Sequence, residues 1–312
     1  MIETRDLTKH YGSLVAVDRL SFQVEPGEVL GFLGPNGAGK STTMRMIAGF
    51  VAPTSGSIIV GEHDLSVDPL AAKRIIGYLP EGAPSYGDMT PGDFLNFIAD
   101  VRALTGTYRQ QRLDDVIDRL HLEEVLTQRI ETLSKGFKRR VGLAQAILHD
   151  PAVLILDEPT DGLDPNQKHE VRALIDTMSA DKTIIISTHI LEEVDAVCDR
   201  ALIIANGHLI VDETPEQLLQ HSSSNNAVTL KLGNEQQCSA AAATLEAMID
   251  VDHVDINSNT SEVTAYAKDG AFILQDIAVA AHERNWELLD LNQASGRLDE
   301  VFRDVTRSGD TP

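Results

Sequence analysis

One run of residues, Gly34-Pro35-Asn36-Gly37-Ala38-Gly39-Lys40-Ser41, restricts the possible fold of this chain more than any other feature of the sequence. The run matches the phosphate-binding loop pattern, which requires a buried strand before the loop and a helix after it. Residues 29–33 are apolar and strand-length, and the residues after Gly39 favour a helix. We therefore predict an α/β domain of the P-loop NTPase class.

Each part of the loop has a physical role in binding a nucleotide. Glycines let the backbone approach closely enough for N–H groups to surround phosphate oxygens, and the helix that follows points its positive end at the same anion. Lys40 adds a charge for the β and γ phosphates, and the Ser41 hydroxyl can ligate Mg²⁺. The predicted phosphate-binding residues are Gly34, Pro35, Asn36, Gly37, Ala38, Gly39, Lys40, Ser41 and Thr42.

A second motif lies downstream, where the apolar segment 153–156 ends in Asp157 and Glu158. Ligands of parallel sheets gather at the carboxyl ends of strands, so Asp157 is expected within reach of a Mg²⁺ ion held near Ser41. Glu158 can then polarise the attacking water as a general base. A strand that ends in a solvated acidic turn would explain an isolated Asp-Glu pair, but a complete P-loop upstream favours hydrolysis.

The order of short apolar segments and helical patterns divides the chain into parts. Residues 1–220 alternate strands with helices, which predicts a mainly parallel sheet. The expected strands are 29–33, 75–79, 153–156, 183–187 and 201–204. A helical subdomain is expected at about 88–149, with Phe94, Phe97, Ile98 and Val101 on one helix face.

The C-terminal part is expected to form a second, smaller domain. Residues 221–226 are polar and turn-rich, which is typical of a linker. Beyond them, residues 227–312 show a βαββαβ order that predicts a ferredoxin-like α+β module. A final amphipathic helix carries Leu298, Val301, Phe302 and Val305 on one face. We assign no site to this part.

Composition and charge restrict the possible partners. The formal net charge of −22 disfavours nucleic acid, because affinity for a phosphate backbone rests on Lys and Arg. No apolar stretch approaches the roughly 20 residues that a membrane-spanning helix needs, and the charged N-terminus is unlike a secretory signal. We therefore expect a cytoplasmic protein. Cys198 and Cys238 stand apart from other metal-ligand residue types, and we assign them no role.

The segment between the two nucleotide-binding motifs indicates which class of P-loop NTPase this chain resembles. Residues 133–140, Leu-Ser-Lys-Gly-Phe-Lys-Arg-Arg, resemble the signature motif of ABC ATPases, and Tyr11 stands where that family stacks adenine. Asp161 to Asp164 match its D-loop, and His189 matches its switch histidine. Together with the P-loop and the Asp157-Glu158 pair, these landmarks occur in the family's order over residues 1 to about 215. The chain is therefore identified as resembling the ABC ATPases.

The resemblance implies a mechanism in which two subunits act together. In that family ATP lies between the P-loop of one subunit and the signature of another, so Ser134 and Gly136 would complete the site of a second copy or of a homologous subunit. His189 would contact the γ-phosphate, and Asp161 would belong to the loop at the dimer seam. A serine that opens a helix suits this role, since its hydroxyl and the helix N-terminus both attract phosphate.

Three residues depart from the commonest family pattern. Glu81 stands where a glutamine is usual, and its carboxylate can still approach Mg²⁺ or water. Lys135 replaces a glycine and Phe137 a glutamine, and packing is the favoured role for Phe137. These three variants, and the C-terminal segment at about 298–302, resemble those of the ABC ATPases that partner ABC-2 type permeases in export.

The resemblance further implies a Mg²⁺-dependent ATPase that works peripherally on the inner face of the cell membrane with an integral permease. Tyr86, Phe94 and Phe97 of the helical subdomain are candidates for permease docking, although core packing explains them equally well. One alternative is a soluble ABC ATPase acting on DNA or ribosomes, which the acidic charge disfavours. Another is an ATP-switched regulatory module, which the intact hydrolytic residues disfavour.

Overall fold

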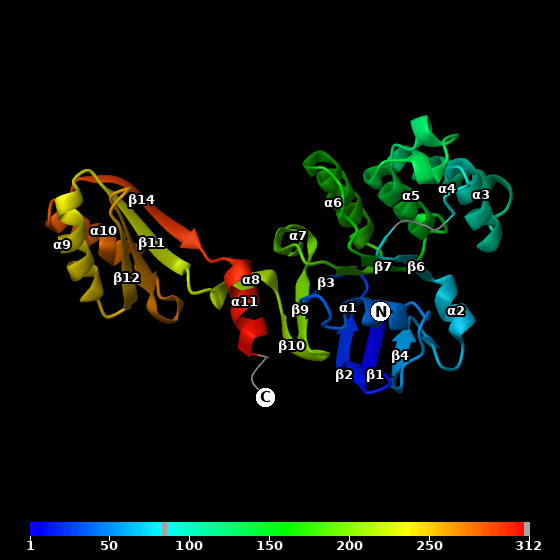
Figure 1. Cartoon of the computed structure of the whole chain (residues 1–312), viewed down its shortest axis with the longest axis horizontal. Coiled ribbons are helices and arrows are strands. Elements are labelled where there is room, and N and C mark those ends of the chain that lie inside the picture. The colour runs from blue at the N-terminus through cyan, green and yellow to red at the C-terminus, as the bar shows by residue number, and fades with distance from the viewer. Residues whose placement is uncertain (83–85, 309–312) are drawn as a thin grey trace. The chain divides into compact units, whose positions relative to one another are not determined.

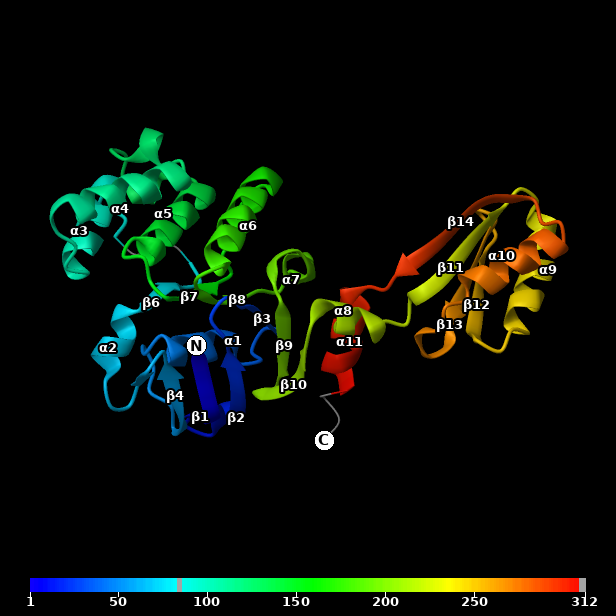
Figure 2. The same cartoon turned by 180° about the vertical axis from the view of Figure 1, so that it is seen from behind.

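The structure is a computed structural model that describes residues 1–82 and 86–308. Its internal contacts separate two units, Met1–Glu213 and Thr214–Thr311. Figures 1 and 2 show the course of the chain from opposite sides. Among the described residues, none of the helices combines the length and the apolar character needed to cross a membrane.

The first unit is built on a six-stranded sheet with the order β10-β9-β3-β8-β7-β6. All neighbouring pairs are parallel except β10 with β9, which confirms the predicted mainly parallel sheet. Every residue of the central strands is buried, as expected of strands that are covered on both faces. The strands are β3 (Val29–Leu33), β6 (Ile76–Leu79), β7 (Val153–Asp157), β8 (Thr183–Ser187), β9 (Arg200–Ala205) and β10 (His208–Glu213).

An antiparallel sheet in the same unit was not predicted from the sequence. It has the order β2-β1-β4-β5 and consists of β1 (Ile2–Tyr11), β2 (Leu14–Val24), β4 (Ser55–Val60) and β5 (His63–Asp64). Helix α1 (Lys40–Ile47) shares one hydrophobic core with residues of both sheets, including Met44, Phe32 and Ile2. This packing fixes the N-terminus of α1, and therefore the P-loop, against the buried strand β3 (Figure 1).

The helices after β5 and β6 include the predicted helical subdomain, which lies at one end of the unit in Figures 1 and 2. They are α2 (Pro69–Arg74), α3 (Pro91–Val101), α4 (Gly106–Arg119), α5 (Lys135–Ile147) and the short turns η1 (Glu123–Val125) and η2 (Ile130–Thr132). The predicted face of α3 is present, since Phe94, Phe97, Ile98 and Val101 all line one groove. Exposure varies along this face: Phe94 is 2% exposed, whereas Phe97 is 40% and Val101 63% exposed. Helices α6 (Pro165–Ser179) and α7 (Leu191–Val197) complete the unit.

The second unit has a four-stranded antiparallel sheet with the order β12-β13-β11-β14. The elements run β11 (Asn225–Leu232), α9 (Glu235–Glu246), β12 (Val251–Asn257), β13 (Glu262–Ala267), η3 (Lys268–Gly270), α10 (Leu274–Glu283) and β14 (Leu288–Ser295). This is the predicted βαββαβ order of a ferredoxin-like module. Side chains from β11, β13, α9 and α10 form its own core, which includes Leu230, Val263, Leu245 and Ile277.

The tract expected to be a linker is part of this second unit. Residues 221–226 follow α8 (Pro215–Gln220), and Ser222 and Ser224 are 6% and 8% exposed. Both hydroxyls donate to Glu300 Oε2, at 2.7 and 2.8 Å, from helix α11 (Leu298–Ser308). The serines are therefore not solvated linker residues, because a carboxylate of the last helix satisfies them.

Candidate active site

The P-loop connects β3 to α1, and its backbone adopts conformations that require glycine. Gly37 and Gly39 have φ angles of 84° and 105°, in the left-handed region that glycine tolerates. A side chain at Gly39 would also meet the backbone, since its Cβ would lie 2.4 Å from Ala16 O. The predicted phosphate-binding residues thus form one turn at the amino end of α1, where backbone N–H groups can face an anion.

Lys40 is the first residue of α1 and is 8% exposed. Its Nζ donates to Gly34 O at 2.6 Å and to Pro35 O at 3.2 Å, so the ammonium group lies within the loop. Burial lowers the pKa of Lys40, and the charges of Glu158, Asp157 and Glu81 act in the opposite direction. A partly desolvated cation in this place attracts phosphate more strongly than an exposed one would.

Asp157 ends β7 and is 1% exposed, yet neither of its carboxylate oxygens has a hydrogen-bond partner among the described residues. Buried carboxylates are normally paired or bound to a cation. No cluster of three or more His, Cys, Asp or Glu side chains in residues 1–82 and 86–308 could hold a metal by itself. Mg²⁺ commonly uses one or two protein oxygens together with substrate phosphates, so Asp157 and the hydroxyl of Ser41 fit this ion.

Glu158 follows directly and is strained in a way that is common at functional sites. Its φ is 53°, although it is not a glycine, and its backbone N–H donates to Ser187 O at 2.8 Å. Its Oε2 lies 2.9 Å from His189 Nδ1, which joins the ends of β7 and β8. Burial raises the pKa of Glu158, and the hydrogen bond from His189 and the charges of His189 and Lys40 oppose this shift. A carboxylate with a raised pKa is suited to accept a proton from water.

Glu81 lies beyond the carboxyl end of β6 and is exposed. Its charge acts on Lys40 and on Arg139, which places it in the same electrostatic environment as Asp157 and Glu158. Arg139, on α5, was not among the residues predicted from the sequence. It is 5% exposed and donates to main-chain carbonyls next to Glu81 and at Asp157 and Glu158.

The signature residues lie where α5 begins. Ser134 is the N-cap, and its Oγ accepts a hydrogen bond from Phe137 N at 3.3 Å. Gly136 is buried, and a Cβ there would lie 2.7 Å from the side-chain oxygen of Gln167. Phe137 packs against the guanidinium of Arg140, 5.7 Å from its ring centre, in line with the expected packing role.

The remaining predicted residues lie at the edge of the unit. Tyr11 ends β1, is 49% exposed and has Lys9 Nζ 5.1 Å from its ring centre. Asp161 is exposed at the turn before α6, and Asp164 caps that helix by accepting from Gln167 N at 3.0 Å. An exposed ring and an exposed turn can both take part in contacts to ligands or partners.

A buried carboxylate that the sequence analysis missed connects two loops of the site. Glu193 on α7 is 4% exposed, accepts from Thr160 Oγ1 and accepts from Thr188 Oγ1 at 2.9 Å. Thr160 precedes Asp161, and Thr188 precedes His189. The only sequence signal was a Glu-Glu pair at the start of a short helix, which is common on solvated surfaces.

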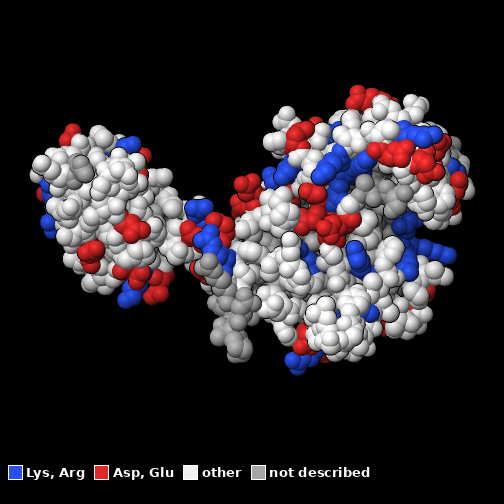
Figure 3. Space-filling model, in the orientation of Figure 1, with Lys and Arg blue, Asp and Glu red and all other residues white. Residues whose placement is uncertain are grey.

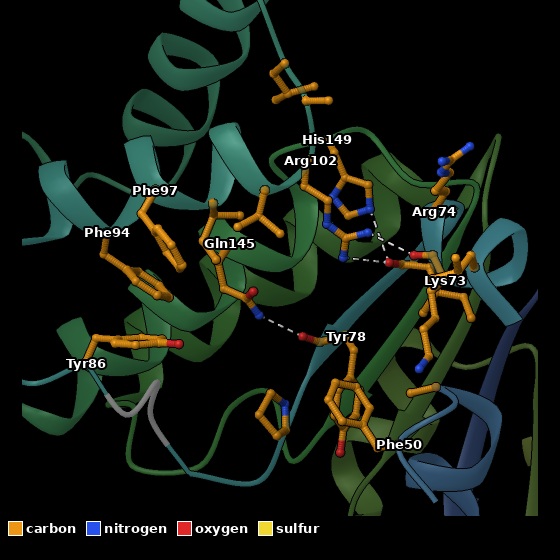
Figure 4. A pocket seen from close by; sticks show the side chains of 18 of the residues that line it. Phe50, Lys73, Arg74, Tyr78, Tyr86, Phe94, Phe97, Arg102, Gln145 and His149 are labelled. Carbon is orange, nitrogen blue, oxygen red and sulfur yellow. Dashed lines mark hydrogen bonds between the residues drawn. The ribbon is translucent and has the colours of Figure 1, made fainter. Parts of the chain in front are cut away.

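A groove opens between α3 and the strand β6 in the same unit, with a volume of about 1110 Å³. Figure 4 shows Tyr86, Phe94 and Phe97 on one side, Phe50 and Tyr78 on another, and the cations Lys73, Arg74 and Arg102 close by. Tyr86 lies 5.7 Å from both Phe94 and Phe97, measured between ring centres. On the face of the molecule shown in Figure 3, Lys and Arg are interspersed with Asp and Glu. An apolar groove with cations at its rim is thus a distinct surface of this unit.

Comparisons with known proteins agree with this geometry. The family model for ABC transporters matches residues 17–161. The chain is 30% identical to the linearmycin resistance ATP-binding protein LnrL of Bacillus subtilis (strain 168), over 98% of each chain. It is 32% identical to the Nod factor export ATP-binding protein I of Rhizobium etli, over 98% of this chain and 93% of that protein. A solved ATP-binding subunit of an ABC transporter superposes with a TM-score of 0.66 and 31% identity, covering 70% of this chain and 91% of that structure.

Proposed function

The chain belongs to the ABC transporter family as an ATP-binding and ATP-hydrolysing subunit, and we propose that it energises a separate membrane permease for export. The observation that carries the hydrolytic assignment is the Glu158 to His189 contact of 2.9 Å beside the Asp157 carboxylate, which has no hydrogen-bond partner in the described part of the chain. Export is supported by a relative that aligns along most of its length and is named for Nod factor export.

The residues of the site have different roles in hydrolysis. The P-loop N–H groups and Lys40 bind the phosphates, and Glu158 accepts a proton from the attacking water while His189 holds its carboxylate in place. Ser41 and Asp157 would hold Mg²⁺, with Glu81 as a further candidate at the edge of the site. That ion supplies charge neutralisation for the phosphates. Tyr11 is proposed to stack on the adenine ring.

Hydrolysis is proposed to require a dimer. The chain has one P-loop and one signature segment, and the exposed Ser134 at the N-terminus of α5 is suited to a phosphate held by another subunit. Gly136 permits close packing there, and the exposed Asp161 is proposed to lie at the seam. The partner is a second copy or a homologous ATPase subunit.

The groove beside α3 is proposed to receive the permease. Phe50, Leu70, Phe97 and Val101 are 70%, 70%, 40% and 63% exposed, an apolar surface of the kind that marks binding sites. With Lys73 and its neighbours at the rim, it suits an amphipathic helix that carries acidic residues. The subunit would then work as a peripheral protein on the inner face of the membrane.

The hydrolytic assignment is tested with Glu158→Gln. Loss of the general base is expected to lower kcat by about 100-fold or more, while the affinity for ATP stays within about twofold. Steady-state ATPase assays and ATP titrations measure the two quantities. Glu192→Gln is the matched control, because Glu192 is an exposed carboxylate on α7. Turnover by Glu158→Gln at the rate of the control would remove Glu158 as the base.

The proposed membrane partner is tested by a pull-down. Tagged Glu158→Gln protein with ATP serves as the bait, and detergent-solubilised membranes of its own source supply the candidate partners. Recovery of a multi-spanning membrane protein is the expected result. Adding Lys73→Glu and Phe97→Asp should abolish that recovery without weakening ATP binding, because the groove lies outside the phosphate loop. Recovery of soluble proteins or nucleic acid alone would leave the ATPase assignment intact and contradict the transport assignment.

A further inference from the structure

Arg139 makes more main-chain contacts around the active site than a packing residue needs. Its Nη1 donates to Pro80 O at 2.9 Å and to Gly82 O at 3.1 Å, the carbonyls on either side of Glu81. Its Nη2 donates to the carbonyls of Asp157 and Glu158, and its Nε donates to Pro159 O at 3.4 Å. One side chain therefore ties together two segments that are 75 or more positions apart in the sequence, at Glu81 and at Asp157.

The chemistry of these contacts fits positioning better than charge pairing. A buried cation is costly unless its donors are satisfied, and the hydrogen bonds of Arg139 end on carbonyl oxygens. The guanidinium is planar, with donors in a fixed fork, so carbonyls that bind it are held at defined relative positions. A lysine has a single ammonium group and cannot reach five carbonyls spread over this distance.

We infer that Arg139 is a positioning residue that holds Glu81 in register with Asp157 and Glu158. The inference rests on the proposed roles of Asp157 and Glu158 in the hydrolysis of ATP. Arg139 acts through the backbone of these residues and needs no contact with nucleotide.

Arg139 also contacts a segment that lines the groove. Tyr78 and Pro80 line the groove, and the carbonyl of Pro80 is one that Arg139 binds. Arg139 therefore contacts both a segment that lines the groove and the carbonyls of Asp157 and Glu158.

The test uses the full chain with Arg139→Gln and Arg139→Lys. Misplaced carboxylates are expected to lower kcat by about 100-fold in Arg139→Gln, with the affinity for ATP in EDTA within about twofold. The gain in ATP affinity on adding Mg²⁺ should disappear, because it depends on where Asp157 lies and is measured without turnover. Arg139→Lys keeps the positive charge but loses the planar fork of N–H donors. It should therefore recover less than about a tenth of the kcat that Arg139→Gln loses.

Arg112→Gln is the matched control. Arg112 also donates to two main-chain carbonyls, Ile147 O at 2.8 Å and Leu148 O at 3.0 Å, but at the other end of α5. It should lower thermal stability as much as Arg139→Gln does without changing kcat or the Mg²⁺ effect. Full recovery by Arg139→Lys, or equal losses of kcat in Arg112→Gln and Arg139→Gln, would overturn the inference. If Glu158→Gln still turned over ATP, the base assignment would fail, and the Mg²⁺ effect on ATP binding would still test Arg139.

Discussion

Glu193 shows how a single buried side chain can set the geometry of two loops. Its two carboxylate oxygens accept from Thr160 and Thr188, and the backbone N–H of Ile190 donates to Thr188 Oγ1 at 3.0 Å. The loops that carry Asp161 and His189 therefore share one acceptor. A hydrogen bond to a charged acceptor is worth about 1.5–3 kcal/mol, so the link is strong enough to matter for both loops.

Replacing Glu193 with alanine should affect turnover as well as stability. We expect kcat to fall at least about tenfold, because His189 is no longer fixed beside Glu158, and the free energy of unfolding to fall by about 1–3 kcal/mol. Steady-state kinetics and urea unfolding give the two numbers. Glu193→Gln keeps one acceptor and should lie between the alanine variant and the wild type. Unchanged kcat in Glu193→Ala would show that the link does not position His189.

Sequence reasoning could identify the site residues whose role is indicated by their neighbours in the sequence. Lys40 and Glu158 each lie in a short motif, and the residues beside the motif predict the end of a strand or the start of a helix. Arg139 and Glu193 were not identified because each has a partner far along the chain, 59 positions away for Arg139 and Pro80 and 33 for Glu193 and Thr160. Such contacts follow from tertiary packing, and neither an arginine within a helix nor a Glu-Glu pair signals them.

At the scale of secondary-structure elements, a half-buried histidine just beyond the carboxyl end of α5 makes stability depend on pH. His149 Nε2 lies 3.1 Å from Ile76 O, and its Nδ1 has no partner among the described side chains and backbone. Burial, aided by the charge of Arg102, lowers the pKa of His149 to about 4. The neutral ring is therefore the form that fits between α5 and β6.

The sign of this pH effect follows from the lowered pKa. In the unfolded chain His149 titrates near its ordinary value of about 6.5, so its contribution to stability is complete above that pH. It is lost as the pH falls from about 6.5 to about 4, by up to about 3 kcal/mol. His149→Gln should flatten the stability profile over this range in urea unfolding at several pH values. The exposed His169→Gln is the control, and identical slopes for both variants would contradict the assignment.

The elements themselves were predictable where burial is uniform. Strands β3, β7 and β8 are buried at every residue, so continuous apolar runs marked them in the sequence. Strand β1 does not keep a strict alternation of buried and exposed residues and contains register shifts against β2, so the period on which a strand prediction depends is interrupted.

At the scale of the whole molecule, the two units have separate hydrophobic cores. One core includes residues of β1, α1 and β3, and the other includes residues of β11, α9 and α10. The second unit is closed by α11, whose Glu300 accepts from Ser222, Ser223 and Ser224. Burial by itself would raise the pKa of Glu300, but these hydrogen bonds together lower it, so the carboxylate stays charged.

Separate cores predict two unfolding transitions in calorimetry that respond to different changes. ATP binds the first unit and should raise only its transition, by mass action. Glu300→Ala leaves two buried serine hydroxyls without their carboxylate acceptor. It should shift only the transition of the second unit, by lowering the free energy of unfolding of that unit by about 1–3 kcal/mol. The exposed Arg303→Ala on the same helix is the control and should shift neither by more than about 0.5 kcal/mol. If ATP and Glu300→Ala both moved a single shared transition, the units would fold as one cooperative body, and the second unit would be a structural part of the ATPase. Independent transitions would instead mean that the stability of the second unit can change without changing the stability of the first.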